Sequence, residues 1–155
     1  MAAHSVIVKR WDDLTTRELY AVLKLRTDVF YVEQKVDDSE LDWRDAEPST
    51  LHLWIEEDGA PVAYLRVLQD AEPEYRDARR VIGRVVVHPE HRGRGLAQEL
   101  LAAVVERFGD ESMLLHAQSY IVPLYLRAGF EAVGDEFVEA GIPHQSMWRP
   151  GAAIG

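Results

Sequence analysis

The spacing of apolar and polar residues predicts a chain in which strands and helices alternate. Apolar runs that alternate with polar residues, or that are continuous and bounded by turn-forming residues, are typical of strands. Strands are expected at residues 6–11, 50–57, 61–69, 81–87, 113–118, 130–138 and 146–148. The run 81–87 is apolar on both faces, as in a central strand that is covered from both sides. Asp58-Gly59 predicts a tight hairpin, because both residues accept positive φ.

Two longer segments and one shorter segment have helical spacing. The first begins at the capping box Thr15-x-x-Glu18. Its inner face is expected to carry Leu19, Val22, Leu23, Val29 and Phe30. The second, with an apolar stripe over residues 96–108, ends at Gly109, where a C-terminal cap is expected. The third is short, because Pro123 fits best in a first helical turn and Gly129 ends the segment.

The order of elements favours one α/β domain. The strand, helix and strand between residues 81 and 118 imply a parallel crossover. A chain of 155 residues with 47% hydrophobic residues suits one domain spanning 1–155, with a core at about 6–149 and a frayed tail at 150–155. The acidic connection at 37–49 is too long for a tight turn, and we treat it as a candidate functional loop.

Composition excludes several classes of protein. The chain has no cysteine, which rules out disulfides, thiolate zinc ligands and a cysteine nucleophile. Without a signal-type N-terminus, the expected compartment is the cytoplasm. No apolar run approaches the roughly 20 residues of a membrane span, so no membrane partner is expected. The formal net charge of -10 argues against a nucleic-acid surface.

A glycine-rich basic turn follows the strand at 81–87 and precedes the second helix. Unpaired N–H groups at a helix N-terminus bind anions when glycines let the anion approach, so this turn has the form of a diphosphate site. The sequence lacks the Gly-Lys-Ser/Thr ending of a Walker loop, and Gly93-x-Gly95-x-Ala97 does not fit the Rossmann fingerprint. By itself the pattern also fits an ordinary strand-to-helix turn.

Two motifs carry a resemblance to a known family. Arg92-Gly93-Arg94-Gly95-Leu96-Ala97 fits the pattern R/Q-x-x-G-x-G/A, and Tyr125-Leu126-Arg127-Ala128-Gly129-Phe130 fits a downstream Tyr-x-x-x-Gly-Phe pattern. Together they resemble the GNAT N-acetyltransferase superfamily. The chain further resembles the ElaA-like branch. The segments that carry this second resemblance are Leu25-Arg26-x-x-Val29-Phe30-x-Val32-Glu33-Gln34, Ala117-Gln118 and Gly141-Ile142-Pro143-His144-x-x-Met147.

The resemblance implies a GNAT-type mixed, mostly antiparallel central sheet flanked by helices. A parallel strand pair, ending near Val87 and Gln118, is expected to splay apart and admit the pantetheine arm of acetyl-CoA, whose amides would satisfy the unpaired backbone groups. The Val87 N–H is expected to polarise the thioester carbonyl. The residues expected to bind the co-substrate are Val85, Val86, Val87, Arg92, Gly93, Arg94, Gly95, Leu96, Ala97 and Gln118.

The resemblance also implies roles in catalysis. Tyr125 matches the family's general acid, which gives its proton to the departing thiolate; the alternative is a core tyrosine that packs a helix against the sheet. Glu33 is the first candidate for the general base. The alternatives for Glu33 are a solvated helix-end carboxylate and a structural partner of Arg26. Arg84 stands where some relatives carry a glutamate linked to deprotonation, which leaves the base open.

His116 is the next candidate for the base after Glu33, because it lies on the strand expected to flank the cleft. His52 and His144 are similar, with His144 favoured by its motif, so all three histidines are candidates for contact with substrate. The alternative for each is a histidine that is simply hydrogen-bonded in place. No pair of them has a ligand spacing such as H-x-x-x-H, so no metal is expected. Gln118 stands where many superfamily members carry asparagine, a substitution that matches the ElaA-like branch, and its longer amide is expected to bond the pantetheine arm through a different contact.

The expected function is acetyl transfer from acetyl-CoA to a primary amine of a small molecule or peptide, by direct attack on the thioester. The acidic loop would attract a cationic acceptor through its long-range field, although such runs are usually solvated loops. The alternatives are a non-catalytic acyl-CoA sensor with the same fold and an enzyme that transfers longer acyl groups. A homodimer is left open.

Overall fold

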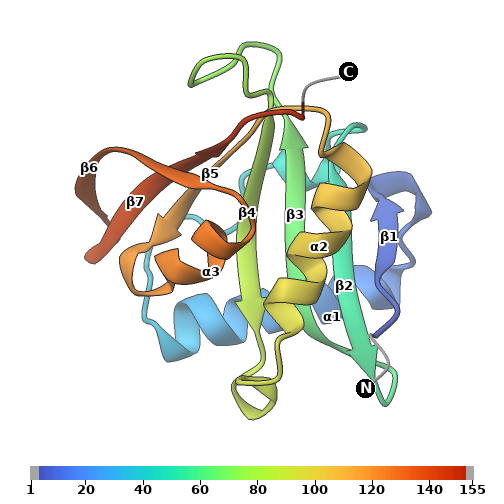
Figure 1. Ribbon diagram of the computed structural model, residues 1–155. Coiled ribbons are helices and arrows are strands. Elements are labelled where there is room, and N and C mark those ends of the chain that lie inside the picture. The colour runs from blue at the N-terminus through green and yellow to red at the C-terminus, as the bar shows by residue number, and fades with distance from the viewer. Residues whose placement is uncertain (1–3, 153–155) are drawn as a thin grey trace.

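The computed structural model describes residues 4–152, which form a seven-stranded sheet with the order β1-β2-β3-β4-β5-β7-β6 (Figure 1). The strands are β1 (Ile7–Arg10), β2 (Leu51–Glu57), β3 (Ala60–Gln69), β4 (Arg80–Val87), β5 (Met113–Gln118), β6 (Glu131–Glu139) and β7 (Ile142–Arg149). β4 and β5 run parallel and the other neighbouring pairs run antiparallel, which confirms the expected mixed sheet. The last part of the expected tail, 153–155, lies outside the described residues.

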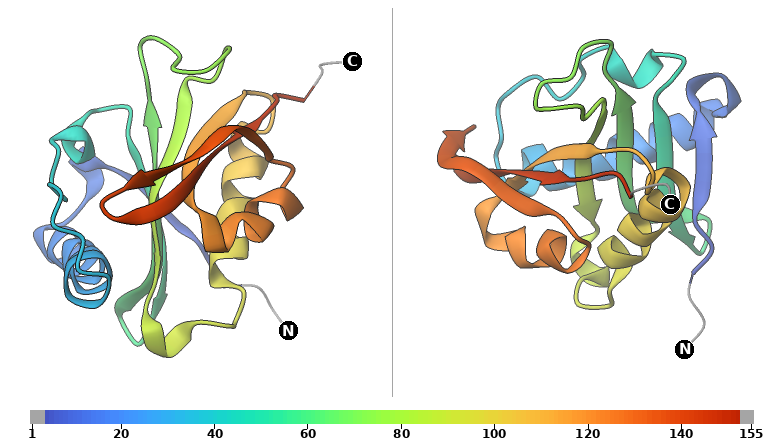
Figure 2. Two further views of the ribbon diagram at one scale, coloured as in Figure 1. Left: turned by 90° about the vertical axis from the view of Figure 1, so that its left-hand side faces the viewer. Right: turned by 45° about the horizontal axis from the view of Figure 1, so that its top comes forward.

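Helices cover both faces of the sheet. α2 (Leu96–Phe108) and α3 (Val122–Arg127) lie on one face and α1 (Thr16–Thr27) on the other, as the edge-on view in Figure 2 shows. The α2 face contains the larger apolar core, and the α1 face contains a second cluster around Trp54 and Tyr64. None of the helices within 4–152 has the length and apolar character that a bilayer crossing needs.

α1 begins as predicted and ends in a way the pattern did not predict. Thr15 and Glu18 form both bonds of the capping box. After Thr27 the helix continues as a wider π-helical turn, Asp28–Glu33, in which the Gln34 N–H reaches back to the Val29 carbonyl (2.9 Å). A π turn holds more residues than an α turn and so redirects the side chains that follow it. Glu33 and Gln34 therefore leave the helix in a different direction from that of a regular α1.

Two other local predictions are confirmed in position. Asp58 and Gly59 connect β2 to β3 with φ of 53° and 79°, the positive values that the hairpin requires. Gly109 caps α2, although with a right-handed φ of -63° rather than the left-handed conformation common at this position. β4 is central, but it is half-buried over most of its length, because its end borders a cleft instead of a second layer of side chains.

The last strand is longer than predicted. The apolar run indicated only 146–148, whereas β7 spans Ile142–Arg149 and pairs with both β5 and β6. Pro143 lies within the longer strand, and proline disfavours a strand because it lacks the N–H that would donate to the ladder. The pairing with β5 ends at His144 opposite Gln118, so β5 offers no ladder at the position of Pro143.

The acidic loop is held against the sheet by buried arginines. Asp45, 6% exposed, accepts bonds from Arg26 on α1 (2.7 Å) and from Arg66 on β3 (3.1 Å). Both guanidinium groups are almost fully buried. These contacts lower the pKa of Asp45 despite its burial, which alone would raise it.

Two further acidic residues complete this set of ion pairs. Asp42 forms a two-pronged pair with Arg66 (2.9 and 2.6 Å), and Glu40 lies 2.8 Å from the guanidinium of Arg84 on β4. We call the set the buried charge network; its members are Arg26, Glu40, Asp42, Asp45, Arg66 and Arg84. Three carboxylates face three guanidinium groups, so the network as a set is neutral, and these three acidic residues of the loop add no free negative charge.

The buried charge network predicts a large effect of a single substitution. Asp45→Ala leaves Arg26 and Arg66 buried without their shared carboxylate, and we expect a loss of about 3–5 kcal/mol in the free energy of unfolding. Urea denaturation of the purified variant measures this loss in the free energy of unfolding. Asp37→Ala, in an exposed part of the same acidic segment, is the control and should change stability by less than about 0.5 kcal/mol. Equal small effects would contradict a structural role of the network.

Candidate active site

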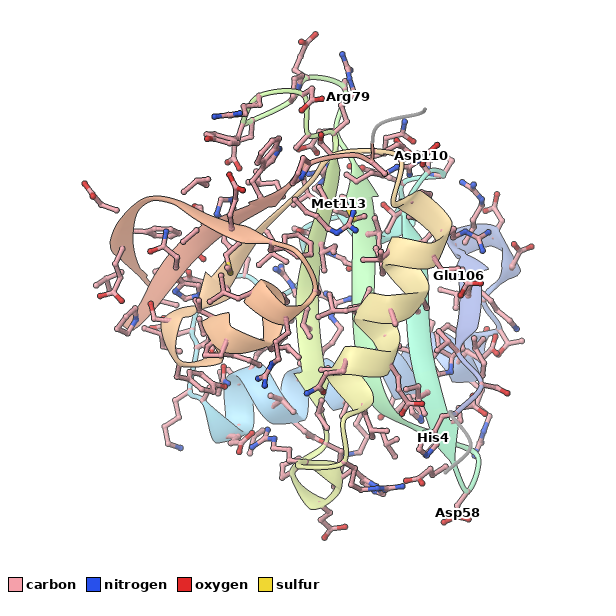
Figure 3. All side chains as sticks on the ribbon, viewed as in Figure 1. His4, Asp58, Arg79, Glu106, Asp110 and Met113 are labelled. Carbon is pink, nitrogen blue, oxygen red and sulfur yellow. The ribbon has the colours of Figure 1, made fainter. Side chains whose placement is uncertain are left out.

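The central parallel strands part before they end. The pairing of β4 with β5 begins at Arg80 with Met113 and stops at Ile82 with Leu115. β5 stays paired with β7 to its last residue, Gln118, and β4 stays paired with β3 to its own last residue. In Figure 3, Met113 marks the paired end of β5, and Asp58 marks the opposite end of the sheet, toward which β4 and β5 diverge. The predicted splay between these strands is present.

A bulge in β4 lies where the strands part. The register between β3 and β4 shifts between Tyr64 and Arg66, and opposite this shift Arg84 has a φ of 53°. A left-handed conformation is costly for a residue with a side chain, so surrounding contacts must hold it. Glu40 provides them, because both its carboxylate and its backbone carbonyl bind the Arg84 guanidinium. The acidic loop therefore helps to hold β4 in its bent shape.

The divergence leaves the backbone of Val87 without a strand partner on one side. The N–H of His88 donates to the Val62 carbonyl (2.8 Å), and Val87 lies opposite Ala63. Because N–H and C=O groups alternate in direction along an antiparallel ladder, those of Val87 point away from β3, into the gap. The Val87 carbonyl accepts a bond from Arg92 Nε (3.1 Å), whereas the N–H has no ladder partner.

A cleft of about 1060 Å³ follows the gap and brings together most of the predicted site. Among the residues that line it are Gln34, Arg84, Val85, Val86, Val87, Arg92, Gly93, Gly95, Leu96, Ala97, His116, Gln118, Tyr125 and His144. Of the residues expected to bind the co-substrate, only Arg94 does not line the cleft. Glu33 and His52 do not line it either.

The turn before α2 presents unpaired backbone amides. Gly93 and Gly95 have φ of 79° and 76°, which a residue with a side chain adopts only at a cost. A Cβ at Gly93 would touch nothing, so the backbone conformation, and not crowding, requires glycine there. No side chain of the part of the chain that the structure describes caps α2, and the first N–H groups of the helix lack intrahelical acceptors. This turn therefore has the amide donors and the helix dipole of an anion site.

The arginines of this turn are already engaged. Arg92 forms a two-pronged pair with Glu33 (2.6 and 2.6 Å), and this pair lowers the pKa of the Glu33 carboxyl. Arg94 forms a similar pair with Glu57 (2.8 and 2.6 Å), which lowers the pKa of Glu57 to about 2. The partner of Glu33 is thus Arg92, and not the Arg26 considered from the sequence.

Tyr125 projects from α3 into the core beneath the cleft. It is 3% exposed, packs edge-on against Phe130 and touches the cleft lining. Burial raises the pKa of the Tyr125 phenol, so the group keeps its proton at every working pH. Within residues 4–152 no side chain or backbone group forms a hydrogen bond to this phenol, which leaves its proton available to a bound molecule.

The amide of Gln118 is paired within the cleft. Gln118 Nε2 donates to Gln34 Oε1 (3.0 Å), and a longer bond of 3.4 Å returns from Gln34 to Gln118. Gln34 follows the π-helical turn, so this contact links α1 to the open end of β5. Gln34 was part of the ElaA-like motif, but nothing in the sequence indicated that the two amides meet.

The three candidate histidines have different environments. His52 is buried between β2 and the acidic loop, bonded to the Tyr64 hydroxyl (2.7 Å) and the Asp45 carbonyl (3.0 Å), and this burial lowers its pKa. His116 and His144 line the cleft. The structure thus brings two of the three to the site.

The sequence did not indicate that the buried charge network reaches the cleft. Glu40, Asp42, Arg66 and Arg84 all line it. Their partners lie 14 to 44 positions apart in the chain, on α1, β3, β4 and the acidic loop. No local spacing signals such pairs; only the presence of lone arginines in otherwise apolar runs points to them.

Comparison with known proteins agrees with the geometry. The chain matches the family model for an acetyltransferase (GNAT) domain over residues 18–149. It is 41% identical over 144 residues to a UPF0039 protein of Mycobacterium tuberculosis, covering 90% of this chain and 89% of that protein.

Two solved structures have the same fold. An acyl-CoA N-acyltransferase from Pseudomonas aeruginosa superposes with a TM-score of 0.83 at 40% identity, covering 94% of this chain and 99% of that one. Escherichia coli ElaA superposes with a TM-score of 0.84 at 30% identity, covering 95% and 99%. By sequence and by fold, this chain belongs to the GNAT acetyltransferase family, as a relative of ElaA.

Proposed function

We propose that this protein transfers the acetyl group of acetyl-CoA to the primary amine of a small molecule or peptide. The observation that carries the proposal is the parting of β4 from β5 beside the uncapped N-terminus of α2. The gap supplies unpaired backbone groups for an amide-bearing arm, and the turn supplies donors for its diphosphate. Both lie in one continuous cleft.

Backbone amides, and not arginine side chains, would provide most of the diphosphate binding. The guanidinium groups of Arg92 and Arg94 are each bound by a carboxylate, so they add little free positive charge to the turn. We assign Glu33 the role of holding Arg92 over the end of β4 instead of the role of base. Its carboxylate lies outside the cleft lining and its lowered pKa makes it a weak proton acceptor.

The remaining groups fit acyl transfer by direct attack. The Val87 N–H, which points into the gap, would stabilise the negative charge that develops on the carbonyl oxygen. As the N–C bond forms and the C–S bond breaks, the thiolate takes the proton of the Tyr125 phenol. Burial raises the pKa of this phenol, which keeps it protonated until the thiolate forms.

The direct test is thiol release from acetyl-CoA in the presence of a panel of primary amines, with calorimetry of CoA binding in parallel. We expect CoA binding and amine-dependent thiol release. Binding without release for any amine would favour the non-catalytic sensor, and absence of binding would contradict both functions. A series of longer acyl-CoA molecules in the same assay measures the acyl-chain preference.

Gly95→Ala should weaken CoA binding about tenfold. Alanine at a φ of 76° costs about 1–2 kcal/mol, and the turn can relieve this cost by leaving the conformation that presents its amides. Gly59→Ala is the matched control, because Gly59 has a φ of 79°, has no atom near its Cβ position and lies outside the cleft. Titration calorimetry measures the CoA affinity of both variants. Equal affinities would contradict a role of the turn in CoA binding.

Tyr125→Phe should lower kcat by about 10² and leave CoA affinity unchanged, because general acid catalysis typically contributes 10²–10⁴. The phenol has no protein partner in the described part of the chain, so its removal orphans no buried group. Tyr120→Phe is the control, since Tyr120 also lines the cleft but is 73% exposed. Steady-state kinetics measure kcat for both variants. An unchanged kcat in Tyr125→Phe would exclude this phenol as the general acid.

A further inference from the structure

Two imidazoles line the cleft, and their hydrogen bonds distinguish them. His116 Nε2 lies 2.8 Å from a carboxylate oxygen of Glu74, and its Nδ1 lies 2.8 Å from the hydroxyl of Ser146. A carboxylate only accepts, so Nε2 carries the proton and Nδ1 accepts from the hydroxyl. Both nitrogens of His116 are therefore occupied.

His144 has one nitrogen fixed and one free. Its Nδ1 lies 2.7 Å from the Ile142 carbonyl, which can only accept, so the proton is on Nδ1 and the lone pair of the neutral ring is on Nε2. Within residues 4–152 nothing forms a hydrogen bond to Nε2, and the His144 side chain is 10% exposed. Its charged neighbour is Glu139 of β6, 3.7 Å away and 58% exposed. Phe137 stacks on the ring at 5.8 Å and limits its rotation.

His144 and Tyr125 belong to opposite faces of the sheet. His144 lies opposite Gln118 in the β5–β7 ladder, and residues directly opposite project to the same face. Gln118 contacts Gln34, so this is the face of α1. Tyr125 packs in the core on the α2 face. The gap between β4 and β5 connects the two faces.

We infer that His144 Nε2 is the general base that deprotonates the acceptor amine, an inference that rests on the proposed acetyl transfer. Nε2 accepts a proton from the ammonium group and passes it to solvent beside Glu139. The neutral amine attacks from the α1 face, the N–C bond forms, the C–S bond breaks and the thiolate takes the Tyr125 proton. The acceptor nitrogen loses two protons. The first leaves the ammonium group before attack and is released to solvent through His144. The second leaves after the N–C bond forms and restores the proton that Tyr125 gave to the thiolate.

This base would act on aliphatic amines, which are protonated at neutral pH and must lose a proton before attack. Aryl amines are neutral at pH 7 and need this step far less. The isomers benzylamine and p-toluidine therefore separate the role of a base from that of a structural residue. Both belong in the amine panel of the thiol-release assay.

His144→Gln should lower kcat/KM for benzylamine by about 10², and for p-toluidine by less than tenfold, with CoA binding intact. His116→Gln, the matched control, should leave the ratio of the two substrates unchanged. Equal loss for both amines in His144→Gln, or no loss, would overturn the assignment. If this variant fails to bind CoA, the assay uses His144→Ala with added imidazole: restored benzylamine turnover supports the base, and no restoration overturns it.

These outcomes remain separate from the proposed function. If the wild-type protein acetylates no amine of the panel, the proposed function fails and the role of His144 fails with it. If the wild-type protein is active and His144→Gln keeps its full activity toward benzylamine, only the role of His144 is contradicted.

Discussion

The candidate site depends on one break in the backbone hydrogen bonding, the end of the β4–β5 ladder at Ile82 and Leu115. Buried backbone groups are costly when unpaired, so a sheet parts only where something else satisfies or holds the strands. β7 holds β5 along its whole length, and the bulge at Arg84 turns β4 away. The Val87 N–H and the cleft are both consequences of that divergence.

The buried charge network links this divergence to the rest of the molecule. It ties α1 through Arg26, β3 through Arg66 and β4 through Arg84 to one loop. Buried ion pairs rarely add much net stability, but removing one partner is costly, so they fix the relative positions of the groups they join. Through Arg26 the network helps to hold α1, and hence Gln34 at the edge of the cleft, together with the apolar cluster on the same face.

Local features of the sequence predicted local structure well. The capping box of α1, the stripe of α2 and the Asp58-Gly59 hairpin depend on neighbours within a few residues, and the structure has all three. The pair of Glu33 with Arg92 joins residues 59 positions apart and has no such signature. The predicted strand at 146–148 was shorter than β7, which contains Pro143. Proline disfavours a strand unless the neighbouring strand has no ladder at that position. Here β5 ends at Gln118, opposite His144, and only the assembled sheet reveals this.

The contrast between His116 and His144 shows why residue type alone could not distinguish the histidine proposed as the base from its neighbour. Both are histidines on neighbouring strands of one cleft. A carboxylate and a hydroxyl occupy the two nitrogens of His116, whereas a backbone carbonyl fixes the proton of His144 on Nδ1 and leaves Nε2 unbonded. A base needs a lone pair that faces the substrate, and a carbonyl acceptor on the far nitrogen provides this without adding charge. The proposed acid and the proposed base lie on opposite faces of the sheet, so one acyl group could meet both only through an opening between strands, and the parting of β4 from β5 provides that opening.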